Sequence, residues 1–261
     1  MTDAEYLTTP ALGGLTGLRH GFFTRRGGVS EGPWAALNCS LSGQDDRDRV
    51  RENRRRAAGA LGLDLPALHG LTQVHGIEVA EVDAAGWAEG HGPKADAMVT
   101  RRPGIALGVI TADCAPVLLA DPRAGVIGAA HAGWRGAVTG VIEATLAAME
   151  RLGAERARVV AAVGPCIAQA SYEVGPDLRA EVLARDPEDA RFLAPGRRED
   201  RWQFDLAGYC AFRLSAAGVA TVETAGVDTL AEEARFFSHR RRTLAGGGPI
   251  GHQLSAIALA P

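Results

Sequence analysis

Short, almost continuous apolar runs through the middle and end of the chain constrain its fold most strongly. They are too short for helices of ordinary length and too apolar for strands with one face in water. Such runs are typical of strands covered on both faces. They occupy residues 105–110, 116–120, 126–130, 159–163 and 255–258. Residues 77–82 instead alternate apolar and polar side chains, which predicts a half-buried strand.

Helical periodicity is interleaved with these runs. Residues 135–151 carry apolar side chains at i, i+3, i+4 and i+7 spacing, and Gly153 follows as a stop signal. Two further helices are predicted at residues 46–60, with acids in the first turn, and at about residues 206–217. The pattern predicts a mixed α/β or α+β fold. We expect one compact domain over residues 1–261, with a mixed central sheet flanked by helices and residues 1–14 as a loose N-terminal segment.

Size and composition favour an ordinary globular protein. A chain of 261 residues can bury about three-quarters of its unfolded surface. Its net charge of -3 gives no reason to expect a nucleic-acid or anionic-membrane partner. No apolar run approaches the roughly 20 residues that span a bilayer, and the acidic start lacks the features of a signal peptide. Four scattered cysteines do not suggest a disulfide scaffold, so we expect a reducing, cytoplasmic setting.

Three segments far apart in the sequence place a possible metal ligand at the end of a predicted strand or at the start of one. The ligands are His75, Cys114 and His131. Two imidazoles and one thiolate can hold zinc with its fourth position open, and an open position distinguishes catalytic from structural zinc. The set therefore indicates an enzyme, although the residue spacing matches no local ligand signature.

The residues around His131 add an anion-binding character. Gly133 and Gly136 allow close approach to the backbone, and the start of the predicted helix offers free N–H groups. Arg135 adds a guanidinium that can hold an anion through two hydrogen bonds. A second basic, glycine-rich turn lies at residues 23–30.

Asp113, beside Cys114, has two possible functions. It could orient His75 or His131 by accepting a hydrogen bond from the imidazole, or it could cap a turn.

Several segments together resemble the bacterial YfiH-type family, long described as multicopper polyphenol oxidases or laccase-domain proteins and now regarded as purine nucleoside phosphorylases. The matching segments follow the family's order and lie at residues 23–30, 37–38, 73–76, 112–116, 131–136, 164–167, 172–174 and 236–241. The resemblance implies a compact α/β domain with zinc held by His75, Cys114 and His131. It also implies a phosphate or substrate role for Arg25, and it brings Asn38 into the candidate substrate site.

The resemblance further implies the substrates. These are adenosine, inosine, guanosine and methylthioadenosine with phosphate, together with an adenosine deaminase side activity. The chain departs from the family pattern at Arg242, where an acidic residue is frequent, and at His252, where an arginine is frequent. The roles of residues 240–242 and of His252 therefore stay open.

The older oxidase description conflicts with the histidine content. Four-copper oxidases need about ten histidines, many paired as His-x-His, whereas this chain has seven and no such pair. A His-His-Cys set suits zinc, although copper could displace zinc in vitro. We therefore expect no native laccase activity.

The leading hypothesis is zinc-assisted phosphorolysis, with phosphate held by zinc, Arg25, Arg135 and helix N–H groups. Asp113 or a zinc-bound water would protonate the leaving purine. A second hypothesis makes Cys114 a metal-free nucleophile activated by His131, as in cysteine hydrolases and deamidases. A third is a non-catalytic purine-binding module. We expect a monomer or a weak homodimer.

Two local motif matches do not support other activities. Residues 28–32 match the nucleophile-elbow pattern, but no strong strand precedes them and no helix follows. Residues 246–251 match a dinucleotide-binding spacing too close to the end of the sequence for a βαβ unit.

Overall fold

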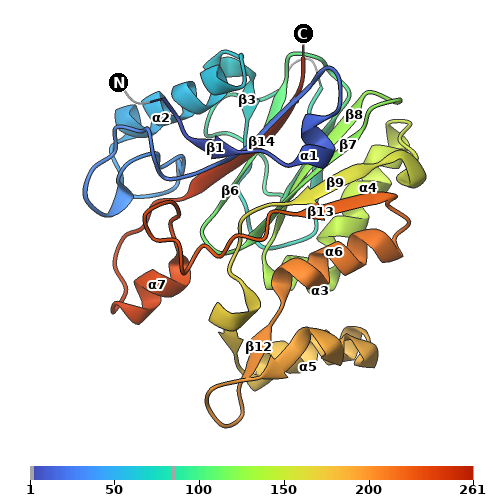
Figure 1. Cartoon of the computed structure of the whole chain (residues 1–261). Coiled ribbons are helices and arrows are strands. Elements are labelled where there is room, and N and C mark those ends of the chain that lie inside the picture. Colours follow the sequence, from blue (N-terminus) through green and yellow to red (C-terminus); the bar gives the residue numbers. More distant parts are fainter. Residues whose placement is uncertain (1–2, 84–85, 261) are drawn as a thin grey trace.

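Two mixed β-sheets stacked face to face form the centre of the protein (Figure 1). The computed structural model describes residues 3–83 and 86–260. The five-stranded sheet has the order β1 (Tyr6–Leu7), β2 (Leu18–Phe23), β14 (Gln253–Leu259), β6 (Ala106–Thr111) and β3 (Leu68–His69). The six-stranded sheet has the order β13 (Thr221–Thr224), β9 (Val160–Val163), β7 (Ala115–Asp121), β8 (Val126–Ala132), β5 (Ala97–Thr100) and β4 (Val79–Glu81).

Helices cover the outer face of each sheet. The five-stranded sheet is covered by α2 (Arg47–Ala60). Ala57 and Ala58 of this helix, with Leu61 just after it, belong to one buried cluster with residues of the sheet. The six-stranded sheet is covered by α3 (Trp134–Thr139), α4 (Val141–Arg151) and α6 (Leu206–Ala216). The mixed α/β fold class is thus confirmed. The single central sheet is corrected to two, because apolar strands can also be covered by another sheet.

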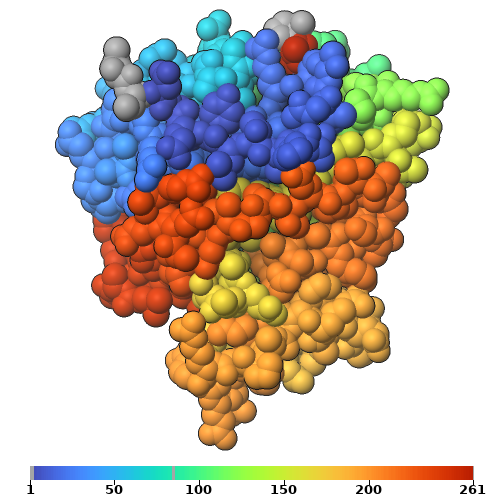
Figure 2. Space-filling view, viewed as in Figure 1, coloured from blue at the N-terminus to red at the C-terminus, as the bar shows by residue number. Residues whose placement is uncertain are grey.

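A smaller lobe projects from the helical side of the six-stranded sheet (Figures 1 and 2). It contains α5 (Pro176–Arg185) and an antiparallel sheet of β10 (Glu173–Val174), β12 (Trp202–Phe204) and β11 (Leu193–Pro195). Leu178, Val182 and Phe204 join the lobe to the main apolar cluster. The remaining helices are α1 (Pro10–Gly13) and α7 (His239–Leu244), and short 3₁₀ turns lie at Gly32–Trp34, Leu65–Ala67, Arg156–Arg158, Gln169–Ser171 and Pro187–Phe192.

All six predicted strands are present, with shifts of one or two residues at most of their ends. The predicted helix at 46–60 is α2, and the side chain of Asp46 caps it by accepting hydrogen bonds from the Asp48 and Arg49 amides. The predicted helix at 206–217 is α6, capped by Asp205.

The helix predicted at residues 135–151 is wrong in one respect. Gly140 adopts a left-handed conformation with φ of +113°, and it ends α3 and begins α4. The apolar face continues across this break, so periodicity alone could not reveal it. The break leaves α3 only six residues long, which weakens the dipole expected at its start.

The N-terminal segment is not loose, contrary to the prediction for residues 1–14, of which residues 1–2 lie outside the described residues. Strand β1 pairs with β2, and Leu12 of α1 is fully buried between the two large sheets. The Ala11 amide also donates to the Glu223 carboxylate of β13. Figure 2 shows this segment, in blue, lying flat on the body of the protein. Among the described residues, no helix is both long enough and apolar enough to cross a bilayer.

We predict opposite effects of alanine at two glycines. Gly140→Ala forces an L-residue into a left-handed conformation, so it should lower the free energy of unfolding by about 1–2 kcal/mol. Gly59→Ala lies at an exposed position of helix α2 with open space around the added carbon, and it should raise stability by about 0.5–1 kcal/mol. Urea unfolding of both variants measures this. Equal effects of the two substitutions would contradict the assigned break at Gly140.

Candidate active site

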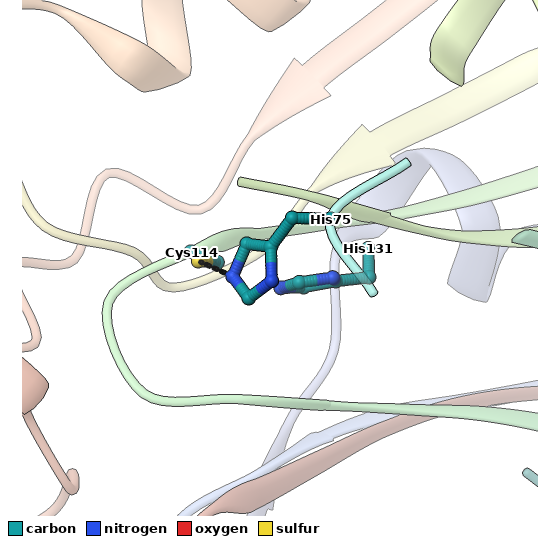
Figure 3. Close-up of side chains that lie close together, drawn as sticks. All are labelled: His75, Cys114 and His131. Atoms are coloured by element: carbon teal, nitrogen blue, oxygen red, sulfur yellow. Dashed lines mark hydrogen bonds between the residues drawn. The ribbon is translucent and has the colours of Figure 1, made fainter. Parts of the chain in front are cut away.

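The side chains of His75, Cys114 and His131 converge on one point at the end of the six-stranded sheet (Figure 3). His75 comes from the loop before β4, Cys114 from the turn between β6 and β7, and His131 from the end of β8. Their ligand atoms all lie within 4.8 Å of one another, and Cys114 Sγ lies 3.9 Å from His75 Nε2. The fold therefore brings together the three residues that the sequence suggested.

A buried carboxylate that the sequence analysis missed holds both histidines. Asp96, fully buried before β5, accepts hydrogen bonds through Oδ1 from His131 Nδ1 at 2.8 Å and from the His75 amide at 2.9 Å. Its Oδ2 accepts from the amides of Val74 at 3.1 Å and Gly76 at 2.6 Å. His75 has a φ of +59°, a strained conformation for a non-glycine residue, which these bonds hold in place.

Asp113 does not orient either imidazole, so that alternative is wrong. Its Oδ1 accepts from the Thr229 hydroxyl at 2.7 Å, and its Oδ2 accepts from the Ser238 hydroxyl at 2.9 Å and the Arg240 amide at 2.6 Å. Asp113 thus ties the start of α7 to the loop that carries Cys114. Asp113 therefore fixes a part of the cavity wall and makes no hydrogen bond to His75 or His131.

The three side chains fit a zinc ion by donor type and by spacing. His131 uses Nδ1 for Asp96, so its Nε2 remains for a metal. Ordinary zinc bond lengths place a thiolate sulfur and an imidazole nitrogen about 3.6 Å apart around a tetrahedral ion. The observed 3.9 Å between Cys114 and His75 is close to that value.

The local charges favour a thiolate at Cys114. Burial by itself raises the pKa of this thiol, but the imidazoles of His131 and His75 outweigh burial and lower the pKa to about 6. Burial alone also lowers the pKa of His131, whereas the Cys114 sulfur and the Asp96 carboxylate raise it. Without a metal, the local charges therefore favour a thiolate beside an imidazolium at neutral pH.

Gly133 is required because the ligands pack directly on its backbone. A Cβ atom at this position would lie 2.8 Å from His75 Cδ2 and 3.1 Å from Cys114 Sγ. The small residues after His131 therefore admit the other two ligands of the site.

The ligand set opens into a cavity of about 1150 Å³. Arg135 lines it with its guanidinium carbon 4.4 Å from the centre of the Trp134 ring. Arg240 lines it 5.3 Å from the centre of the Tyr172 ring. Two cations stacked on aromatic rings thus border the cavity that contains the ligand set.

Arg25 and Asn38 are not among the described residues that line this cavity. Arg25 donates to the carbonyls of Ala35 and Glu233 and lies over the Phe237 ring. Asn38 is fully buried and bonds Asp45. Arg25 is thus held by two backbone carbonyls and Asn38 by Asp45, and neither side chain lines the cavity.

Known proteins resemble this chain over most of its length. The family model described as multi-copper polyphenol oxidoreductase laccase matches residues 19–260. A Deinococcus radiodurans protein named purine nucleoside phosphorylase is 44% identical over 240 residues, which are 92% of this chain and 88% of that protein. A Pseudomonas aeruginosa protein of the same name is 37% identical over 223 residues, with 85% of this chain and 88% of that protein covered.

Solved structures share the fold. A Neisseria meningitidis protein of the DUF152 family superposes with a TM-score of 0.87 at 33% identity, and the match covers 100% of each chain. YfiH from Bacillus licheniformis has a TM-score of 0.87 at 29% identity, with 93% of this chain and 92% of that chain covered.

We predict that Asp96→Asn weakens zinc binding by about 10- to 100-fold, because the amide no longer fixes the His131 ring as a carboxylate does. Asp121→Asn is the matched control, since Asp121 is equally buried but bonds Arg158 at the far end of β7. It should lower stability and leave zinc affinity unchanged. Competition with a chromogenic chelator measures both affinities. Equal zinc affinity in Asp96→Asn and wild type would contradict the assignment.

We predict that alkylation of Cys114 in metal-stripped protein loses half its maximal rate near pH 6, well below an ordinary thiol. The depressed pKa means that the reactive thiolate persists above that pH and is lost as pH falls through it. Replacing His131 with Gln should move the midpoint upward. Cys39, Cys166 and Cys210 are buried and should stay unreactive in the folded protein. A midpoint near pH 8.5 in the unsubstituted protein would refute the charge pairing.

Proposed function

The chain belongs to the family described as multi-copper polyphenol oxidoreductase laccase, and within it we propose that this protein is a zinc-dependent purine nucleoside phosphorylase. The observation that carries the proposal is the adjacency of the His-Cys-His set to a cavity whose described lining includes five arginines, Arg135 and Arg240 among them. The names of the similar proteins support the reaction class. The proposed substrates are adenosine, inosine, guanosine and methylthioadenosine.

The reaction forms a bond between a phosphate oxygen and the anomeric carbon of the ribose while the glycosidic C–N bond breaks. The electron pair of that bond leaves with the purine, which takes up a proton, and the products are the free base and ribose 1-phosphate. Zinc, when bound, supplies a Lewis-acid charge beside the reacting groups.

The chain's own residues would bind and orient the phosphate. Arg135 and Arg240 border the cavity, and each can hold a phosphate through two parallel hydrogen bonds. Asp113 fixes the start of α7 through the Arg240 amide and so places the second arginine. We leave Arg25 out of this scheme, because it is not among the described residues that line the cavity.

The same ligand set suggests the second reaction. Attack of water at C6 of adenosine would release ammonia and give inosine, and zinc sites with an open position commonly support such hydrolysis. We therefore propose adenosine deaminase as a side activity of this site. We also propose that the protein works in the cytoplasm as a monomer or weak homodimer, a setting that suits its four free cysteines.

One specific observation favours a second candidate. The lowered pKa of Cys114 and its contact with His75 and His131 are also what a metal-free cysteine nucleophile needs. A Cys-His hydrolase or deamidase would then need no zinc. Activity that survives complete metal removal and is abolished by alkylation of Cys114 would favour this candidate over the phosphorylase.

We predict that the zinc-loaded protein converts inosine or adenosine to the free base and ribose 1-phosphate only when phosphate is present. Arg135→Gln should raise the KM for phosphate about tenfold or more, because a charged hydrogen-bond donor is lost. Product analysis with and without phosphate measures this, and Arg151→Gln, an exposed change at the end of α4, is the control. Absence of phosphate-dependent ribose 1-phosphate from every purine nucleoside would reject the proposed function.

A further inference from the structure

His252 borders the cavity, and its imidazole has no partner in the described chain. Its Nδ1 is sealed from solvent without a hydrogen bond. The residue is largely buried but not fully sealed, and Nε2 is not among its sealed atoms, so the edge that carries Nε2 is the part that faces the cavity. A buried polar atom without a partner is uncommon in folded proteins and calls for an explanation.

The backbone of His252 is clamped on both sides. Its amide donates to Asn38 Oδ1 at 2.9 Å, and its carbonyl accepts from the Cys39 amide at 3.0 Å. The Asn38 side chain is itself fixed, because its Nδ2 donates to the Asp45 carboxylate at 2.9 Å. Asn38, which the sequence suggested as a substrate ligand, thus positions a residue of the cavity wall.

The environment keeps this imidazole uncharged. Burial lowers the pKa of His252 to about 4, and the nearby His131, His239 and Arg242 add to the effect. A neutral imidazole carries one N–H group. We assign the proton to Nε2, because only there can the N–H reach an acceptor, that of a molecule bound in the cavity.

We propose that His252 is a substrate-binding residue that donates a hydrogen bond from Nε2 to an acceptor atom of the purine base. This inference rests on the proposed phosphorylase function. An uncharged donor suits the neutral nitrogen and oxygen acceptors of a purine, whereas the phosphate is matched by the charged Arg135 and Arg240. The bond strengthens as the leaving base gains negative charge, so it also favours the transition state.

Two substitutions at this position test the proposal. His252→Phe removes the donor, and His252→Gln replaces it with an amide N–H at nearly the same distance from the backbone. His91→Phe is the matched control, because His91 lines the same cavity and its Nδ1 already lies 3.0 Å from the Glu89 carbonyl. Calorimetry without phosphate gives the Kd for inosine, and steady-state kinetics gives the KM for phosphate.

We predict that His252→Phe weakens inosine binding about five- to tenfold and leaves the KM for phosphate and the zinc content unchanged. The Kd of His252→Gln for inosine should stay within about threefold of the wild-type value, and the Kd of His91→Phe should equal the wild-type value. Wild-type affinity in His252→Phe, or an effect confined to the KM for phosphate, would overturn the inference while leaving the phosphorylase intact. A wild-type protein that neither binds nor cleaves purine nucleosides would overturn both.

If His252→Phe does not fold, NMR of the His252 ring in the wild-type protein tests the proposal instead. In the ¹⁵N spectrum of histidine-labelled protein, assigned with His252→Gln, the His252 ring should show the neutral form with the proton on Nε2. Addition of hypoxanthine should shift that nitrogen. A proton on Nδ1, or an Nε2 signal that hypoxanthine does not move, would contradict the proposal.

Discussion

The hydrogen bonds of one buried carboxylate determine the arrangement of the site. Asp96 accepts from the ring of His131 and from three consecutive amides of the loop that carries His75. Burial by itself would raise the pKa of this carboxyl group, but the His131 ring and the loop amides lower it below its usual value. The charge that orients one ligand therefore also fixes the backbone of another, which is why two distant histidines face one sulfur.

The sheet architecture makes this arrangement possible. Strands β5 and β8 are neighbours, and the Asp96 carbonyl accepts from the His131 amide directly beyond the ladder. Strands β7 and β8 are also neighbours, so the turn before β7 brings Cys114 to the same end. Gly133 then leaves room for the His75 and Cys114 side chains. Strand pairing sets the approximate positions of His75, Cys114 and His131, and the hydrogen bonds of Asp96 fix the orientation of the two histidines.

Local sequence predicted six strands and the helices around α2, α4 and α6, because apolar runs and helix caps report nearby interactions. It did not predict the other strands, β2 and β5 among them, or helix α5. It missed the second sheet, since a buried strand looks the same whether a helix or a sheet covers it. It missed Asp96 because a lone acid before an apolar run also occurs as a simple turn cap. The family resemblance placed Arg25 and Asn38 in the site, but their internal partners, such as the Ala35 carbonyl and Asp45, become neighbours only in the folded chain.

The proposed chemistry depends on a metal ion at the convergence of His75, Cys114 and His131. The most direct test is elemental analysis of protein purified without chelators or added metal. We expect about one equivalent of zinc per chain, lost when Cys114 is replaced by Ala. Less than about a tenth of an equivalent of zinc, in protein whose Cys114 is unmodified, would contradict the central claim.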